Sequence, residues 1–348
     1  MRSKALKFIS IVFSIVIFLS LLGLFSLIYL NNPPSRVDGH DPGVVLKIRQ
    51  GESLSEIAKE LQRENLIRSA LFFKLLCKVK GVDTKIKAGY YKISREKTNI
   101  DIIDILTKGK QEEIKITFPE GWTISKIARH LESKGITSAS DFKKAAHSKK
   151  LVEEFGIPGK SLEGFLYPDT YFFPKEFPAE LVAEIMVKNF FKHLKKIEPD
   201  YTKLTSRQLY QKIILASIVE REYRIKEEAP IIASVFYNRL RRNIGLESCA
   251  TLEYIITEIE GKKHPEYITI EDKKLNSDYN TYKWAGLPPG PISNPGKVAL
   301  DAAFHPAKTD YWYFVLEDRK TGKHYFSKSL EEHNRAKYTY LKSVSSGK

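Results

Sequence analysis

The chain carries an uncharged apolar run near its N-terminus, Phe8–Leu30, which is too long and too apolar for an ordinary surface helix. As a helix, its 23 residues would span about 34 Å, enough to cross a hydrocarbon core of about 30 Å. Arg2, Lys4 and Lys7 precede the run, so residues 1–7 are expected in the cytoplasm. The following "LIYLNNPP" offers no small-residue cleavage site, which favours an uncleaved anchor over a signal peptide. We therefore expect a single-pass protein of the cytoplasmic (inner) membrane, with its bulk periplasmic or extracellular.

The charge of the chain bears on its partners. A formal net charge of +15 favours an anionic partner: a phospholipid surface, an acidic wall polymer or nucleic acid. The lysines are scattered, without a basic arm or a nucleic-acid motif, so nucleic acid is not expected. No HExxH or CxxC occurs, and we expect no metal and no cofactor. The spacing of Cys77 and Cys249 leaves a disulfide open.

Residues 31–43, "NNPPSRVDGHDPG", are typical of a linker. After it, the pattern predicts a strand from Val44, a turn at Gly51 and a helix capped by Ser53. Glu56, three residues after Ser53, would complete a capping box. A helix at 69–79, a strand at 88–94 and a helix at 98–110 follow. These elements predict a small module over residues 44–110.

The phrase "ITFPEGWTISKIARHL" repeats the start of this module at an offset of 70 residues. The matched positions share one structural role each, namely a turn glycine, a capping hydroxyl and three packing residues. They are Gly51, Ser53, Ile57, Ala58 and Leu61 in the first copy, and Gly121, Thr123, Ile127, Ala128 and Leu131 in the second. Two related strand–helix units are therefore predicted.

The first unit, with its "GESLSEIAKEL" phrase and its return strand, resembles a LysM module. LysM modules bind glycans built on N-acetylglucosamine, so the resemblance implies a glycan-binding role. A packing or spacer domain is an equal alternative.

Two later segments combine aromatic and polar residues. "KSLEGFLYPDTYFFPKEF" (160–177) suits a sugar-binding platform, although an aromatic mini-core around a turn is favoured by physics alone. "NSDYNTYKWAGLPPGPISNPG" (276–296) predicts a long loop stiffened by prolines, a form typical of functional loops. "YWYFV" and "KHYFS" predict a terminal hairpin.

A buried helix is predicted around "IILASIVEREY". Leu209, Ile213, Ala216 and Glu220 share one stripe, so Glu220 extends a buried face, whereas Glu222 points elsewhere. Burial raises the pKa of a carboxyl group and keeps it able to donate a proton. The alternative is that the helix emerges into water and that "EREY" is solvated.

The chain resembles the endolytic murein transglycosylases of the YceG-like family. The motifs that carry the resemblance occur in the family's order, and they are "LEGFLYPDTY", "LASIVERE", "ASVFYNRL", "YNTY", "GLPPGPISNPG" and "AAFHPAKTDYWYFV". The resemblance implies an α+β catalytic domain over residues 111–340, after the membrane helix and the LysM-like module. It also implies Glu220 as the catalytic residue. One departure is "LESCAT" (246–251), where Cys249 and Ala250 replace the expected Asp and Pro.

The substrate-binding residues that we expect lie in or beside these motifs. They are Glu163, Tyr167, Asp169, Asn238, Tyr279, Asn280, Thr281 and Tyr282. The resemblance implies a lyase that cuts peptidoglycan glycan strands between N-acetylmuramic acid and N-acetylglucosamine, with peptidoglycan synthases as candidate partners. The alternatives are a non-catalytic glycan-binding scaffold and a hydrolase, which would need a second carboxylate. Neither Asp169 nor Asp278 is a convincing one.

Overall fold

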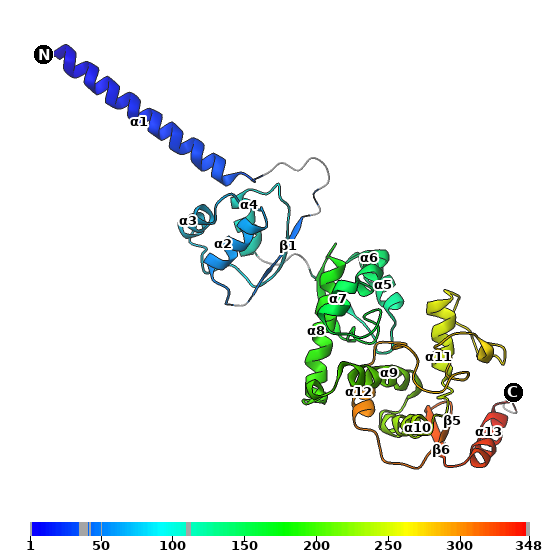
Figure 1. Cartoon of the computed structure of the whole chain (residues 1–348). Helices are drawn as coiled ribbons and strands as arrows, with labels where there is room; N and C mark the ends of the chain where they lie inside the picture. The colour runs from blue at the N-terminus through cyan, green and yellow to red at the C-terminus, as the bar shows by residue number, and fades with distance from the viewer. Residues whose placement is uncertain (1, 35–40, 42, 50, 109–112, 346–348) are drawn as a thin grey trace. The chain divides into compact units, whose positions relative to one another are not determined.

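The computed structural model describes residues 2–34, 41, 43–49, 51–108 and 113–345 (Figure 1). The chain separates into two compact units, Met1–Glu113 and Ile114–Lys348. Both combine helices with short strands, as the predicted α+β class requires. The predicted boundary at 110/111 and most of the predicted linker, 35–40 and 42, lie outside the described residues.

The elements of the first unit follow the predicted order closely. They are α1 (Arg2–Asn31), β1 (Val44–Ile48), α2 (Leu54–Arg63), α3 (Ala70–Val79), β2 (Gly89–Ile93) and α4 (Asn99–Lys108). Strands β1 and β2 pair antiparallel, with Leu46 opposite Tyr91. Both side chains of the predicted capping box are in place, since Ser53 accepts from the Glu56 amide and Glu56 accepts from the Ser53 amide. The predicted elements of this module are confirmed, while its likeness to LysM stays a prediction.

Helix α1 carries the predicted membrane-spanning run. Phe13–Asn31 has a mean hydropathy of 2.5, and none of this segment is buried within the protein. Length and composition therefore fit a membrane span, and a signal sequence would pass the same test.

The second unit contains the remaining elements. Its strands are β3 (Glu113–Thr117), β4 (Thr170–Pro174), β5 (Tyr313–Asp318) and β6 (Lys323–Ser327). Its helices are α5 (Ile124–Ser133), α6 (Ala139–Ala146), α7 (Lys149–Glu154), α8 (Ala179–Ile197), α9 (Ser206–Glu222), α10 (Ala229–Arg241), α11 (Cys249–Tyr254), α12 (Lys297–Phe304) and α13 (Leu330–Ser345). A π turn at Ile255–Ile259 extends α11, and single 3₁₀ turns lie at Tyr201–Lys203, Lys226–Glu228 and Asp272–Lys274.

The predicted repeat is visible in the backbone. Gly51 and Gly121 both adopt positive φ angles, +82° and +74°, where a side chain would be strained. Thr123 caps α5 by accepting from the Lys126 amide, as Ser53 caps α2. The strand of the second copy, β3, pairs with β4 instead of a strand of its own copy. The two copies therefore share the turn and the cap but differ in strand partners.

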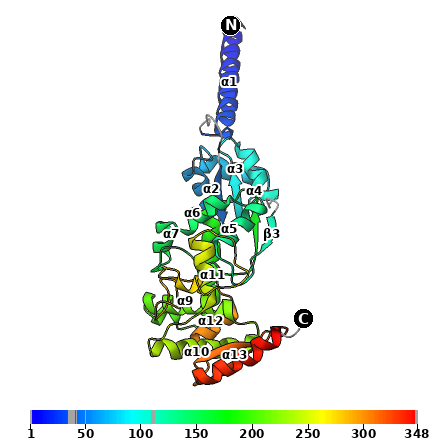
Figure 2. The same ribbon diagram turned by 90° about the vertical axis from the view of Figure 1, so that its right-hand side faces the viewer.

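Helices α9, α10 and α12 form the core of the C-terminal half. In both views α12 lies between α9 and α10, and these helices contact one another (Figure 2). The predicted hairpin is confirmed as β5 and β6, which pair antiparallel with a bulge, and α13 packs against it. Residues 276–296 are irregular, as predicted. In α8 the buried stripe includes Val182 and Val187, whereas Leu181 and Ile185 are only half-buried.

Candidate active site

Helix α9 delivers Glu220 at the end of a fully buried segment. Thr205 and Gln208 form a capping box at its start, and residues 213–219 are all buried. The helix continues for two residues beyond Glu220, so this carboxylate remains on a rigid turn. Neither Arg221 nor Tyr223 is solvated as the alternative requires, because Arg221 pairs with Glu253 at 2.7 Å and Tyr223 contacts Glu220. The prediction that Glu220 extends a buried face is confirmed.

The surroundings of Glu220 keep its carboxyl group protonated near neutrality. Burial raises its pKa to about 8, and the negative charge of Glu120 adds to this effect. Two hydrogen bonds oppose the shift, one from the Gly296 amide to Oε2 at 2.9 Å and one from the Tyr223 hydroxyl to Oε1 at 3.4 Å. The result is a positioned carboxylic acid with a proton to donate at pH 7.

Glu120 is a second carboxylate at this site, and the sequence reasoning missed it. It is exposed on the turn between β3 and α5. A Cβ atom at Gly296 would overlap its carboxylate, so Glu120 and Glu220 both lie against Gly296. The next residue, Gly121, has its Cα beside Glu220, because a Cβ there would be 3.5 Å from Glu220 Cγ. The repeat offers one sequence signal for this residue. At the offset of 70 residues Glu120 stands where the first copy has Gln50, so both copies have a long polar side chain just before the turn glycine.

Asn294 fixes the loop that carries Gly296. Its Oδ1 accepts from the amides of Gly164 and Leu166, each at 2.9 Å, and its Nδ2 donates to the Trp122 carbonyl at 2.9 Å. The backbone carbonyl of Asn294 also accepts from the Gly121 amide at 2.9 Å. One buried amide side chain thus joins three segments around Glu220. The sequence reasoning quoted "PISNPG" but did not single out this residue.

Glu163 lies in the interior and is occupied by protein donors. Its carboxylate accepts from the Ile124 amide at 3.1 Å and from Asn294 Nδ2 at 2.7 Å. Burial raises its pKa to about 8. Because only 4% of its surface is exposed, it offers no face to a glycan. The expected substrate contact of Glu163 stays a prediction, while its burial and its hydrogen bonds favour a positioning role at the start of α5.

Tyr167 and Asp169 form a group with α8. The Tyr167 ring stacks on His193 with centroids 4.1 Å apart, and Asp169 accepts from Asn189 Nδ2 at 3.0 Å. Burial raises the pKa of Tyr167 to about 12, and the charges of Glu120, Asp169 and Glu220 contribute. The structure therefore brings Tyr167 and Asp169 into the electrostatic neighbourhood of Glu220. The other aromatic side chains of 160–177 are mostly buried, as a mini-core requires, although Phe172 is exposed.

Asn238, Asn280 and Thr281 are buried residues that hold loops. Asn238 Nδ2 donates to the carbonyls of Thr309 and Tyr311, and Asn280 Nδ2 donates to those of Lys273 and Leu275. The Thr281 hydroxyl accepts from the Ser248 amide and bonds to the Thr251 hydroxyl. Their polar groups are occupied within the protein, which favours a structural role, and the expected substrate contact stays a prediction.

Tyr279 and Tyr282 are half-buried on the 276–296 loop. The Tyr279 ring packs against Tyr254 with centroids 5.1 Å apart. The Tyr282 hydroxyl lies 3.1 Å from Cys249 Sγ, and the Lys273 ammonium lies 4.7 Å from the centre of its ring. Both tyrosines remain partly exposed, which fits a ligand-facing position.

Glu222 lies on a different side of α9 and is not solvated. Its carboxylate accepts from the Ser248 hydroxyl, and burial raises its pKa. It lines a cavity of about 350 Å³ with Arg239, Cys249 and His324. Glu222 thus points away from the stripe of Glu220, as predicted, but the alternative of a solvated "EREY" does not hold for it, because α11 and the hairpin cover that side of the helix. Cys249, which replaces the Asp expected from the family pattern, lies beside Glu222 in this second region and not beside Glu220.

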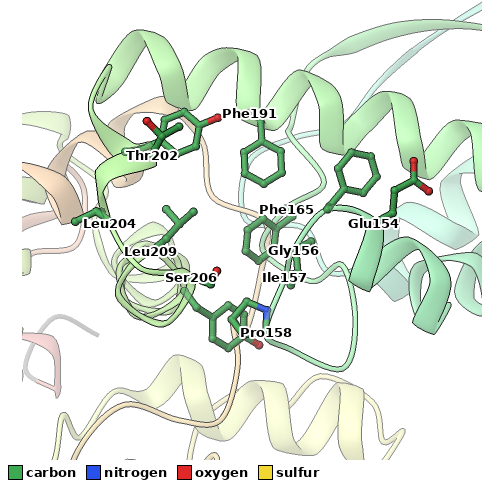
Figure 3. A pocket seen from close by; sticks show the side chains of 13 residues that line it. Glu154, Gly156, Ile157, Pro158, Phe165, Phe191, Thr202, Leu204, Ser206 and Leu209 are labelled. Atoms are coloured by element: carbon green, nitrogen blue, oxygen red, sulfur yellow. The ribbon is translucent and has the colours of Figure 1, made fainter.

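A further cavity of about 370 Å³ lies between α8 and the start of α9 (Figure 3). Phe165 and Phe191 give it an aromatic wall, and Glu154 is its acidic side chain. Among the described residues that line it, none is a predicted site residue. This cavity is separate from the carboxylates around Gly296.

The arrangement around Gly296 places a carboxyl group whose pKa is raised to about 8 beside a second carboxylate, and general-acid chemistry needs a group of this kind. A model of the YceG-like family matches residues 46–339. The chain belongs to the YceG-like family, as the motifs predicted.

Known relatives and a solved structure agree with this membership. An endolytic murein transglycosylase of Bacillus subtilis (strain 168) is 33% identical, over 86% of this chain and 85% of its own. A second, from Streptococcus pneumoniae serotype 2, is 29% identical over 93% of this chain, which spans 64% of that relative. The crystal structure of a yceG-like protein from Listeria monocytogenes is 33% identical, with a TM-score of 0.56, and covers 85% of this chain and 99% of its own.

Proposed function

We propose that this protein is a membrane-anchored endolytic lytic transglycosylase that cuts nascent peptidoglycan glycan strands. The observation that carries the proposal is Glu220, a positioned carboxyl group with a pKa of about 8 that is held by the Gly296 amide. An enzyme of this class needs an acid that is protonated at neutral pH, and membership of the YceG-like family supports the same class. The cut would lie between N-acetylmuramic acid and N-acetylglucosamine and would limit strand elongation.

In the first step, Glu220 donates its proton to the glycosidic oxygen as the bond from that oxygen to the anomeric carbon breaks. Positive charge develops on the anomeric carbon of the muramic acid. The C6 hydroxyl of the same sugar then bonds to that carbon, and its proton passes to the ionised Glu220. No water is consumed, and an intramolecular nucleophile carries a high effective molarity. The product is a 1,6-anhydro-muramic end.

Glu120 gives the site a second negative charge without making the enzyme a hydrolase. It lies against Gly296, as Glu220 does, and it is exposed, so it can face a bound sugar. We assign it the stabilisation of the positive charge at the anomeric carbon. A hydrolytic route would use it as a nucleophile or base instead. The product therefore decides between these two roles.

The remaining predicted residues divide into two groups in this proposal. Those assigned to substrate binding are half-buried or exposed, or lie near the charge of Glu220, and they are Tyr167, Asp169, Tyr279 and Tyr282. Those assigned to positioning the loops around the site are Glu163, Asn238, Asn280 and Thr281. Cys249, which departs from the family pattern, contacts Tyr282. The departure leaves the proposed acid, Glu220, in place, and this supports a catalytic protein over the alternative of a silent scaffold.

The proposed location is the outer face of the cytoplasmic membrane. Phe13–Asn31 is long and apolar enough for an anchor, and Arg2, Lys4 and Lys7 favour a cytoplasmic N-terminus. The substrate in this location is the glycan strand of peptidoglycan, and the synthases that extend it are the proposed partners. The module over 44–110 would serve as a LysM-like glycan-binding domain.

The product analysis tests the proposal. The full chain in detergent is incubated with isolated wall sacculi, beside a Glu220→Gln variant, and the soluble muropeptides are analysed by mass spectrometry. We expect anhydro-muramic ends from the wild type and no release from the variant. Reducing muramic ends alone would identify a hydrolase, and no release by a folded wild-type protein would favour the scaffold.

A further inference from the structure

The end of helix α1 is fastened to the folded module that follows it. The Arg68 guanidinium lies 4.3 Å from the centre of the Tyr29 ring, and it donates to the Tyr29 hydroxyl at 3.0 Å and to the Pro33 carbonyl at 2.7 Å. The buried side chain of Asn99 donates to the carbonyls of Leu30 and Asn31 at 2.9 and 3.1 Å. These carbonyls belong to the last turn of α1, where no intrahelical donor is left for them.

Arg68 and Asn99, which we call the clasp, both stand at the start of a helix. Arg68 precedes α3, whose cap is Ser69, and Asn99 is the first residue of α4. The N-terminal ends of α3 and α4 are therefore held at the end of α1. If α1 spans the membrane, this places both helix starts at the lipid–water boundary.

The exposed apolar surface of the module lies on the same two helices. Among the described residues of 41–108, the large apolar side chains that are exposed are Leu71, Leu75, Val79 and Ile100. Three of them follow the spacing i, i+4 and i+8 along α3 and so form one stripe. Leu71 and Val79 are 74% and 77% exposed, although the opposite side of α3 packs Phe73 and Cys77 into the core.

Lysines border this stripe on one side. At 100° per residue, Lys74 and Lys78 fall on the same edge of the stripe on α3, and Lys78 is exposed. A helix with an apolar face and lysines at its edge is typical of a segment that lies in the headgroup region of a bilayer. The Tyr29 ring at the end of the span fits the aromatic belt at the same depth.

From the clasp and the stripe together we infer that α3 rests on the outer leaflet of the membrane, with Leu71, Leu75 and Val79 inserted among the lipids. The inference rests on the proposed membrane anchor. The proposed partner of the stripe is a phospholipid surface. The stripe starts at Leu71, three residues after Arg68, whose side chain binds the end of the proposed membrane-spanning helix. The module would then contact the bilayer surface and set the orientation of the chain at the membrane.

Depth-dependent quenching tests this contact. The full chain carrying Leu75→Trp is reconstituted in vesicles of phosphatidylcholine and phosphatidylglycerol with brominated acyl chains. The matched control is Lys59→Trp, an exposed position on α2. The native Trp122, Trp284 and Trp312 all lie in the second unit, and the unsubstituted chain supplies their background. In Leu75→Trp we expect blue-shifted emission that bromine reduces, and in Lys59→Trp we expect emission that bromine leaves unchanged.

The outcomes separate this inference from the anchor. Equal, unquenched emission from the two variants, in a chain that resists carbonate extraction, would overturn the lipid contact and leave the anchor standing. Extraction by carbonate would overturn both. An emission change in Leu75→Trp that grows with the protein-to-lipid ratio and ignores bromine would assign the stripe to a second copy, which also overturns the inference. Circular dichroism of each variant shows that the fold is intact.

Discussion

At the scale of single residues, Glu220 shows how a position on a helix becomes a chemical property. The buried segment before it removes water, and the Gly296 amide and Tyr223 hydroxyl hold the carboxyl group in place. Since desolvation outweighs these hydrogen bonds, the pKa is raised to about 8. The same carboxyl group on an exposed helix end would be ionised and could donate no proton at pH 7.

The first prediction concerns pH. In the proposed mechanism the acid form of Glu220 is the active one, so kcat/KM should fall above pH 8, about tenfold for each further pH unit. Initial rates of muropeptide release between about pH 5 and 10 measure this fall. Glu222→Gln, whose amide oxygen can still accept from Ser248, should keep the same alkaline limb. If kcat/KM of the wild type does not fall above pH 8, Glu220 is not the acid.

The second prediction concerns Glu120. Glu120→Gln removes the negative charge that helps to raise the pKa of Glu220, so the alkaline limb should move to lower pH. The rate at the optimum should also fall, roughly tenfold, which corresponds to about 1.4 kcal/mol of transition-state stabilisation. The matched control is Glu113→Gln on exposed β3, which should change neither the limb nor the rate. An unchanged pH profile in Glu120→Gln would remove Glu120 from the site.

The third prediction separates positioning from substrate contact at Glu163. Glu163→Ala leaves the Ile124 amide without its acceptor in the interior and removes one of the two acceptors of Asn294 Nδ2, so the free energy of unfolding should fall by about 1–3 kcal/mol. Denaturant unfolding measures this loss. Asp169→Asn, at an exposed position, should cost less than about 0.5 kcal/mol. Full stability of Glu163→Ala together with a raised KM would restore the substrate-contact role.

At the scale of elements, the start of α12 organises the site. Gly296 caps α12 with φ −86°, an angle that any residue adopts, so its lack of a side chain serves space and not backbone freedom. The three atoms nearest to its missing Cβ all belong to the side chain of Glu120. The glycine thus allows two carboxylates to approach the same point from β3–α5 and from α9.

The fourth prediction follows from this crowding. Gly296→Ala keeps the amide that binds Glu220 but displaces the exposed side chain of Glu120, so it should reproduce the pH shift of Glu120→Gln without a loss of stability. The double variant should be no worse than either single one, because both remove the same interaction. pH–rate profiles of the three variants measure this. Additive losses would mean that the methyl group disturbs Glu220 itself.

At the scale of the whole molecule, the chain consists of two units with separate interiors. The core of the first unit draws on β1, α2, α3, β2 and α4, and all its members lie between Leu46 and Leu106. Asp41 holds the chain at the edge of this core. Its carboxylate accepts from the Gly43 and Arg95 amides and lies 3.6 Å from the Arg95 guanidinium. The module therefore has what it needs to fold without the second unit.

The fifth prediction tests this independence. Residues 41–113, expressed alone, should unfold cooperatively in urea, because their apolar core is complete within the segment. Chemical-shift dispersion and a single unfolding transition measure this. A disordered fragment would show that the module depends on the second unit. Its affinity for soluble glycan fragments then tests the LysM-like role separately from folding.

The local structure of this protein could be predicted from its sequence. The turn glycines, the hydroxyl caps and the apolar spacing of both repeat copies act over a few residues, and so α2, α5 and the β5–β6 hairpin follow the predicted pattern. The motif order identified the family, and the buried stripe of α9 predicted that Glu220 extends a buried face. Each of these depends on contacts that are close along the chain.

The surroundings of those residues could not be predicted from the sequence, because they depend on how distant segments pack together. Glu120 and Glu220 are 100 residues apart, and they meet because Asn294 joins the turn at Gly121 to the loop before α12. Glu163, Asn280 and Thr281 look like ligand-facing polar residues in the sequence, but other segments cover them and take their hydrogen bonds. Helical spacing says which side of α9 a residue occupies, not whether another element covers that side. Burial, which sets the pKa of a carboxyl group, is a property of the packed chain.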